Sequence, residues 1–291
     1  MLFRSDRASL PRNLTLSLGT MSATPLQVAA GYAVFANGGH RIQPWFIERI
    51  VDPQGQVVFE ATPRRVAREC DPPEAITASE TPAIEAATAQ NADAEEAGEA
   101  EALPLPTSCK LPATQVAPRV ISSQNAWLIT DMLRDVITRG TGRRALALGR
   151  SDVAGKTGTT NEARDTWFNG YNPTLVASVW VGFDQSRPLG EGEEGSRTAV
   201  PIWVYFMREA LRAVPERSRP LAPGLVQARI SPSTGELANA DESDAIFETF
   251  LEGHLPGGSG SGGGSVVSPP PTGAPVRPRT DPPATKDEPL F

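Results

Sequence analysis

One short stretch of the chain, Gly155-Lys156-Thr157-Gly158-Thr159, combines a cation, two hydroxyls and two glycines. If it is a β-strand, Thr157 and Thr159 project from the same face, since side chains alternate along a strand. Two hydroxyls on one face can bind the carboxylate of a small acid, and the ammonium of Lys156 favours the same anion. Gly158 lets a substrate backbone approach closely, and the N–H of Thr159 can face a developing oxyanion. We therefore predict a carboxylate-binding strand at a sheet edge, where it can pair with an extended peptide.

Two other interpretations of the same stretch have to be weighed. A phosphate-binding loop needs a glycine, four residues and then Gly-Lys-Ser/Thr, but the position required for that glycine is Arg150. Such a loop must also open a helix, whereas Gly158 and the threonines lead into a turn and another strand. We therefore reject the phosphate loop. A Thr/Gly-rich edge strand with a solvated Lys156 and no ligand remains open on these five residues alone.

Three strand-like runs are predicted in this region, and the first of them contains the stretch. They are residues 153–159, 166–171 and 175–183, and the last is apolar almost throughout, as expected of a buried central strand. Connections of about five and three residues can join only antiparallel neighbours. We therefore expect an antiparallel sheet, with Trp167 and Trp180 in the core.

Helices and hairpins are expected around this sheet. Thr24-Pro25-Leu26-Gln27 has the pattern of a helix start and predicts a helix that runs to Phe35 and stops at Asn37-Gly38-Gly39. Ser122 or Ser123 is expected to cap a second helix, which ends at Gly140-Thr141-Gly142. Further predicted elements are strands at 14–18, 42–51 and 56–59 around a turn at 52–55, short and closing helices at 143–148 and 200–214, and a trailing hairpin of 226–230 with 236–238.

Composition indicates that part of the chain does not pack into a core. Only 39% of the 291 residues are hydrophobic, and residues 256–291 form a Gly/Ser and then Pro-rich tail. Ten acidic residues and no Lys or Arg lie between Glu69 and Cys109, and without them the net charge of −7 becomes about +3. The charge therefore does not point to nucleic acid. No apolar run approaches the roughly 18–20 residues of a membrane span, and no signal peptide is visible.

The two cysteines, Cys70 and Cys109, bracket this acidic, Ala/Glu/Pro-rich stretch. They are either two unrelated thiols or a disulfide that clamps the base of an insertion. A disulfide would imply an oxidising compartment and would remove roughly 3–4 kcal/mol of chain entropy from the unfolded state. Two cysteines and two histidines are too scattered for a metal site, so none is predicted.

Several motifs together resemble the end of the transpeptidase domain of class A penicillin-binding proteins. They are the runs 155–161, 165–171 and 178–184, together with the upstream runs 24–29, 35–39, 119–122 and 140–142. The match covers roughly Leu10 to Phe250 apart from the insertion. It implies an α+β fold, a penicillin-binding/β-lactamase-like antiparallel sheet flanked by helices, with an N-terminal truncation.

The resemblance also implies a division of the chain. Residues 1–66 and 118–255 are expected to be two parts of the transpeptidase domain, the second with the Lys-Thr-Gly strand and the C-terminal helix. Residues 67–117 are expected to be a surface insertion, and residues 256–291 a disordered tail.

Such proteins are serine acyl-enzymes built from a Ser-x-x-Lys helix, a Ser-x-Asn loop and a Lys-Thr-Gly strand. The resemblance implies Lys156 as a catalytic residue, and Lys156, Thr157, Gly158 and Thr159 as the substrate-binding set. The expected ligands are peptidoglycan stem peptides ending in D-Ala-D-Ala and β-lactams, with envelope proteins as further partners and without cofactors. The family is periplasmic and anchored in the inner membrane by an N-terminal segment that also precedes a glycosyltransferase domain.

The first two catalytic elements are not found in this chain. No serine is followed three residues later by Lys, and Ser123-Gln124-Asn125 has the letters of the second motif but begins a predicted helix. We expect the missing elements to precede Met1, the fragment to expose apolar surface, and the chain to be inactive alone. The alternative is a non-catalytic binding or scaffold module of the bacterial envelope that uses the edge strand and the acidic insertion for protein contacts.

Overall fold

The computed structural model describes residues 14, 19, 22–67 and 109–257. It divides into two compact units with the boundary between Gly224 and Leu225, inside the range 118–255 that we expected to be one part of the domain. Residues 15–18 of the predicted strand at 14–18, most of the insertion and nearly all of the tail lie outside the described residues. Cys109 forms a disulfide, but Cys70 also lies outside the described residues, so their pairing stays a prediction.

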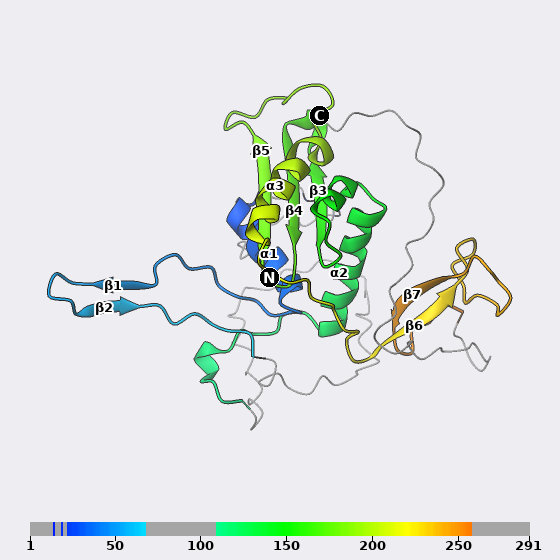
Figure 1. Ribbon diagram of the computed structural model, residues 1–291, viewed down its shortest axis with the longest axis horizontal. Helices are drawn as coiled ribbons and strands as arrows, with labels where there is room; N and C mark the ends of the chain where they lie inside the picture. The colour runs from blue at the N-terminus through cyan, green and yellow to red at the C-terminus, as the bar shows by residue number, and fades with distance from the viewer. Residues whose placement is uncertain (1–13, 15–18, 20–21, 68–108, 258–291) are drawn as a thin grey trace, which may run out of the picture. The chain divides into compact units, whose positions relative to one another are not determined.

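A three-stranded antiparallel sheet forms the centre of the first unit (Figure 1). Its strands are β3 (Ala154–Thr159), β4 (Asp165–Tyr171) and β5 (Val176–Gly182), in the order β3-β4-β5. The three strands and their antiparallel pairing confirm the sequence prediction. Among the described strands β4 is central and β5 is only half-buried, so the prediction that residues 175–183 form the buried central strand is wrong for the described sheet. The strand β5 is apolar because helices contact it, although it lies at an edge of the described sheet.

Two helices, α1 (Pro25–Ala36) and α3 (Val200–Ala210), cover opposite faces of this sheet (Figure 1). Trp203 of α3 packs edge-on against Phe168 with 5.0 Å between ring centroids, and Tyr32 of α1 meets Tyr171 at 6.2 Å. Phe168 and Tyr171 are three residues apart on β4, so they project from opposite faces. The helix α2 (Ser123–Thr138) contacts β3 and lies beside it (Figure 1).

The helix ends follow local sequence signals. Thr24 and Gln27 form the predicted capping box of α1. Ser122 caps α2 by accepting a hydrogen bond from the N–H of Asn125 at 3.1 Å. The predicted helix at 143–148 is a 3₁₀ turn, η5 (Arg143–Leu148). A π-helical turn, η7 (Gly195–Ala199), leads into α3.

Two expectations about the helices can be compared with these bounds. The helix α3 ends at Ala210 and not at Val214, because the chain then continues in turns, in which the N–H groups of Arg212 and Val214 donate to carbonyls three residues earlier. The longest helix of the described residues, α2, has 16 residues. None of the described helices has the length and apolar character needed to cross a bilayer.

The core of the first unit lies between α3 and the sheet. Trp203 and Phe168 are fully buried, and the indole N–H of Trp203 donates to the carbonyl of Gly170 at 3.3 Å. A Cβ on Gly170 would lie 2.7 Å from the Trp203 ring, so this close packing requires glycine. The other buried members of the cluster are Ile137, Ala145, Val153, Ala199, Val200, Val204, Met207 and Leu211.

A two-stranded hairpin, β1 (Arg49–Val51) with β2 (Val57–Glu60), follows α1 along the chain. The predicted turn at 52–55 is present, and the Asp52 carboxylate accepts from the N–H groups of Gln54 and Gln56 at 3.0 and 2.7 Å. The predicted strand at 42–51 is wrong for residues 42–48, which include Pro44, a residue without an N–H to donate.

The second unit contains one hairpin, β6 (Leu225–Ile230) with β7 (Ile246–Leu251). We predicted residues 236–238 as the partner strand; that segment does pair with the end of β6, but only through an antiparallel bridge between Leu237 and Ile230, and the partner strand is β7. The guanidinium of Arg229 donates to the carbonyls of Asn239, Ala240 and Glu242 at 3.4, 3.2 and 2.5 Å and so holds the connecting loop.

Candidate functional site

The predicted carboxylate-binding stretch lies on β3, which is an edge strand of the described sheet. Only a three-residue 3₁₀ turn, η6 (Asn161–Ala163), follows β3 before the antiparallel β4 begins. The stretch therefore opens no α-helix, which agrees with our rejection of the phosphate loop. Ala154 and Gly155 are buried, whereas Lys156 and Thr159 are exposed and the two residues between them are half-buried. The open part of the edge therefore runs from Lys156 to Thr159.

The register of the sheet decides which backbone groups face outward. The N–H of Thr160 donates to the carbonyl of Asp165 at 3.0 Å. Because backbone groups along an antiparallel strand alternate in direction, the N–H groups of Thr157 and Thr159 point away from β4. These two groups are placed to pair with an extended chain added at the edge.

The hydroxyl of Thr159 is held by a residue far along the chain. Its Oγ1 accepts a hydrogen bond from the N–H of Gly195, in the π-helical turn η7, at 3.1 Å. A Cβ on Gly195 would lie 2.5 Å from the Trp167 carbonyl oxygen and 2.7 Å from that of Gly158, so only glycine allows this approach. Since the hydroxyl accepts from Gly195, its own proton is left to donate elsewhere.

Lys156 reaches the same edge from the opposite face of the sheet. It stands opposite Asn169 in the register, whereas Thr157 stands opposite the core residue Phe168. The side chain nevertheless bends around the edge, and Nζ donates to the Thr157 carbonyl at 2.9 Å and lies 3.5 Å from the Thr157 hydroxyl. The cation and the threonine hydroxyls therefore meet at one edge, although the strand alternates them between faces.

A residue that the sequence did not single out for chemistry also joins the site. The hydroxyl of Thr141 lies 2.6 Å from that of Thr157. The Gly140-Thr141-Gly142 tripeptide was interpreted as the end of a helix and as one of the family motifs, but Thr141 was given no chemical role. No periodicity could have paired two residues that lie 16 positions apart in different elements.

Gly158, Trp167 and Trp180 pack together on the face of the sheet that α1 covers. A Cβ on Gly158 would lie 3.2 Å from Cβ of Trp167, its partner in the register, so glycine also serves packing here. Trp167 is half-buried and packs against Trp180, with 6.2 Å between centroids. Trp180 is 36% exposed, so the prediction of a core position is wrong for it. Its indole N–H donates to Asp165 at 2.9 Å and ties β5 to β4.

The turn between β3 and β4 contains two successive non-glycine residues with left-handed backbone, Glu162 (φ 59°) and Ala163 (φ 48°). Such conformations are rarely adopted outside glycine and persist only where neighbours impose them. Here the Ala163 carbonyl accepts from the N–H of Leu189 at 3.0 Å, and Arg164 donates to the carbonyl of Ser186 at 3.1 Å. The turn is therefore fixed to the segment that leads toward Gly195.

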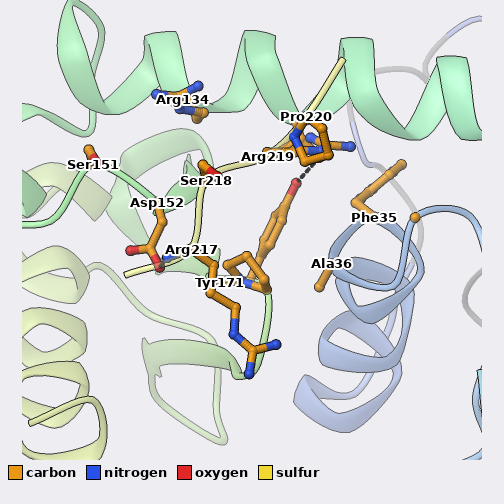
Figure 2. A pocket seen from close by; sticks show the side chains of 13 residues that line it. Phe35, Ala36, Arg134, Ser151, Asp152, Tyr171, Arg217, Ser218, Arg219 and Pro220 are labelled. Atoms are coloured by element: carbon orange, nitrogen blue, oxygen red, sulfur yellow. Dashed lines mark hydrogen bonds between the residues drawn. The ribbon is translucent and has the colours of Figure 1, made fainter. Parts of the chain in front are cut away.

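A separate cavity of about 540 Å³ lies near the other end of β3, where Ser151 and Asp152 precede the strand (Figure 2). Tyr171 projects into it, and its hydroxyl is hydrogen-bonded to that of Thr130 at 2.8 Å. Burial raises the pKa of Tyr171 to about 12. None of the four residues of the predicted binding set lines this cavity.

Asp152 at this cavity is part of a buried ion pair. Its side chain is 2% exposed and lies 2.8 Å from the guanidinium of Arg150. Burial alone would raise the pKa of Asp152, but hydrogen bonds from Arg150 and from the backbone N–H of Arg217, with the Arg150 charge, lower it below its ordinary value. The pair anchors the beginning of β3 to the segment after α3, because Arg150 also donates to the Val214 carbonyl at 2.7 Å.

The Ser-x-Asn letters at 123–125 have a structural place. The cap of α2 is Ser122, and Ser123 is the first residue of the helix. The side-chain amide of Gln124 is buried and donates to the carbonyl of Pro223 at 2.8 Å. These contacts agree with the interpretation that the triplet is not the second catalytic motif.

Comparisons with known proteins agree with the sequence motifs. A family model described as the penicillin binding protein transpeptidase domain matches residues 5–187. Penicillin-binding protein 1A of Pseudomonas aeruginosa is 43% identical over 256 residues, which cover 87% of this chain and 31% of that protein. The protein of the same name from Escherichia coli K12 is 38% identical over 275 residues, covering 83% of this chain and 32% of the relative.

A solved structure gives the same result for the fold. The crystal structure of penicillin-binding protein 1A from Haemophilus influenzae matches with a TM-score of 0.68 and 35% identity, over 86% of this chain and 35% of that chain. This match confirms the predicted penicillin-binding/β-lactamase-like α+β fold. The chain spans about a third of the length of these relatives.

Proposed function

Because the chain belongs to the penicillin-binding protein transpeptidase family, we propose that it supplies the carboxylate-binding edge strand of a D,D-transpeptidase. In this proposal the enzyme cross-links peptidoglycan stem peptides through a serine acyl-enzyme, and β-lactams occupy the same strand. The observation that carries the proposal is the edge of β3, where Lys156 and two outward-facing threonine N–H groups lie beside two threonine hydroxyls.

The contacts of the strand support a specific binding mode. The terminal carboxylate of a D-Ala-D-Ala peptide accepts hydrogen bonds from the hydroxyls of Thr157 and Thr159, and the ammonium of Lys156 favours the same anion. The peptide backbone extends along the edge, where Gly158 leaves room beside it. The N–H of Thr159 donates to the oxyanion that develops when the scissile carbonyl is attacked.

In this family the nucleophile is the serine of a Ser-x-x-Lys motif. No serine of this chain has Lys three residues later, so none fits that pattern. We therefore propose that this chain alone binds stem peptides and β-lactams reversibly but forms no acyl-enzyme. A periplasmic site of action, on the outer side of the inner membrane, is proposed from the family.

Peptide binding tests the role of the strand. An acetylated tripeptide ending in D-Ala-D-Ala should shift the amide resonances of Thr157 and Thr159, whereas the same peptide with a C-terminal carboxamide should bind weakly. Thr159→Val should weaken binding of the acid at least about tenfold, because it removes a hydrogen bond to a charged group. Thr138→Val, an exposed change of the same kind on α2, serves as the control. Equal binding of acid and carboxamide would argue against the carboxylate site.

Labelling with a fluorescent penicillin tests the proposed lack of a nucleophile. We expect no label on the chain after denaturing electrophoresis. A stable covalent adduct, located by mass spectrometry on a serine, would show that the chain carries its own nucleophile.

A further inference from the structure

Thr141 contacts the proposed carboxylate site from a loop outside the strand. Its hydroxyl lies 2.6 Å from that of Thr157, which is within the normal range for an O–H···O hydrogen bond. We propose that Thr141 is a positioning residue that orients the Thr157 hydroxyl toward the bound carboxylate, an inference that rests on the proposed function of β3.

The flanking glycines explain why Thr141 can reach the strand. A Cβ on Gly140 would lie 2.9 Å from Cα of Val136, and a Cβ on Gly142 would lie 3.1 Å from the Val136 carbonyl oxygen. The N–H of Gly142 donates to that same carbonyl at 2.8 Å. The loop therefore lies tightly against the last turn of α2, and its one side chain, that of Thr141, meets β3.

The donors and acceptors at Thr157 give this contact a consequence for the ligand. Each threonine hydroxyl has one proton and two acceptor lone pairs. Whichever hydroxyl donates within the Thr141–Thr157 pair, one proton is used there and the other stays free. The ammonium of Lys156, 3.5 Å from the Thr157 oxygen, has no lone pair and cannot accept that free proton. The pair therefore presents one hydroxyl proton to an outside acceptor.

The same bond fixes the rotamer of Thr157. A β-branched side chain has few χ1 positions, and the bond to Thr141 selects one that directs the hydroxyl toward Thr141. Thr159 is oriented in a comparable way by the N–H of Gly195. Both hydroxyls of the site are thus set by residues outside β3 before a ligand arrives, which reduces the ordering that binding requires.

The test compares Thr141→Val, which keeps the shape and removes the hydroxyl, with Thr141→Ser, which keeps the hydroxyl. Thr138→Val is the control, because Thr138 is also exposed and its hydroxyl is bonded only locally, to Asp135. We expect Thr141→Val to weaken binding of the D-Ala-D-Ala acid about three- to tenfold. Thr141→Ser and Thr138→Val should bind as the unchanged chain does, and affinity for the carboxamide peptide should not change in any variant.

A second measurement, made without ligand, tests the Thr141–Thr157 contact independently of the proposed function. Without any ligand, Thr141→Val should change the Cβ and methyl resonances of Thr157 and its χ1-dependent couplings, whereas Thr141→Ser should not. If the unchanged chain binds no peptide, the proposed function fails while this rotamer effect still tests the contact. An unaltered Thr157 rotamer in Thr141→Val, or equal weakening of acid and carboxamide binding, would overturn the positioning role.

Discussion

The backbone N–H of Gly195 donates a 3.1 Å hydrogen bond to the hydroxyl of Thr159, 36 residues earlier in the chain. The bond joins the π-helical turn before α3 to the exposed end of β3. The turn that leads into α3, a helix that covers one face of the sheet, therefore also orients the Thr159 hydroxyl at the sheet edge.

Gly195→Ala should disturb this junction. The added Cβ would lie 2.5 Å from the Trp167 carbonyl and 2.7 Å from that of Gly158, so backbone has to move. We expect a loss of about 1–3 kcal/mol in the free energy of unfolding, as for other overpacked sites, measured by urea denaturation. Ser196→Ala, at the next residue, should change stability by less than about 0.5 kcal/mol. Equal stability of the two variants would mean that the turn adapts without strain.

Two adjacent serines at the start of α2 have different roles: Ser122 caps the helix, and Ser123 begins the Ser-x-Asn triplet. Ser122→Ala removes the hydroxyl that accepts from the N–H of Asn125 and should destabilise the chain by about 1 kcal/mol. Ser123→Ala lies one residue later, within the helix, and should be close to neutral because alanine favours helix. Urea midpoints of the two variants provide the comparison. A larger effect of Ser123→Ala would contradict the assignment of the cap.

The Arg150–Asp152 pair should make the free energy of unfolding depend on pH in the acid range. The folded pKa of Asp152 lies below its ordinary value, so the unfolded chain binds a proton first as the pH falls. This contribution is present above about pH 4 and is lost as the pH drops through the folded pKa. Asp152→Asn should reduce stability near neutral pH by about 1–3 kcal/mol, since the guanidinium of Arg150 loses a charged hydrogen-bond partner but keeps the Val214 carbonyl.

The acid profile of this variant provides the check. Asp152→Asn should flatten the loss of stability below pH 4, whereas Asp184→Asn, at an exposed position, should leave the profile as it is. Parallel acid profiles for the unchanged chain and Asp152→Asn would exclude a stabilising role of the pair.

Two buried tyrosines should make the free energy of unfolding depend on pH in the alkaline range. Burial raises the pKa of both Tyr32 and Tyr171 to about 12, compared with about 10 in an unfolded chain. Their contribution is complete below pH 10 and is lost as the pH rises from about 10 to 12, by up to about 3 kcal/mol for each group. Tyr171→Phe should flatten part of this alkaline loss, and the tyrosinate absorbance should rise late in the titration of the folded chain. Ionisation of all tyrosines near pH 10 while the fold persists would contradict the burial.

Local signals were sufficient for several elements of the fold. The Thr24–Gln27 capping box and the Ser122 cap involve residues three positions apart, so their chemistry is visible in the sequence. The short connections between the strands allowed only antiparallel pairing. In contrast, the apolar run of β5 could not distinguish a central strand from an edge strand that helices contact, and β7 could not be identified as the partner of β6 across a long loop held by Arg229.

The sequence by itself determined the types of group at the candidate site, namely one ammonium and two hydroxyls on a strand, and with them the family. Tertiary structure decided how these groups are oriented. Lys156 bends around the edge, Thr157 meets Thr141, and Thr159 meets Gly195, and the last two contacts join residues 16 and 36 positions apart. Hydrogen bonds over such separations depend on how α2, η7 and the sheet pack together, and no local pattern in the sequence records that packing.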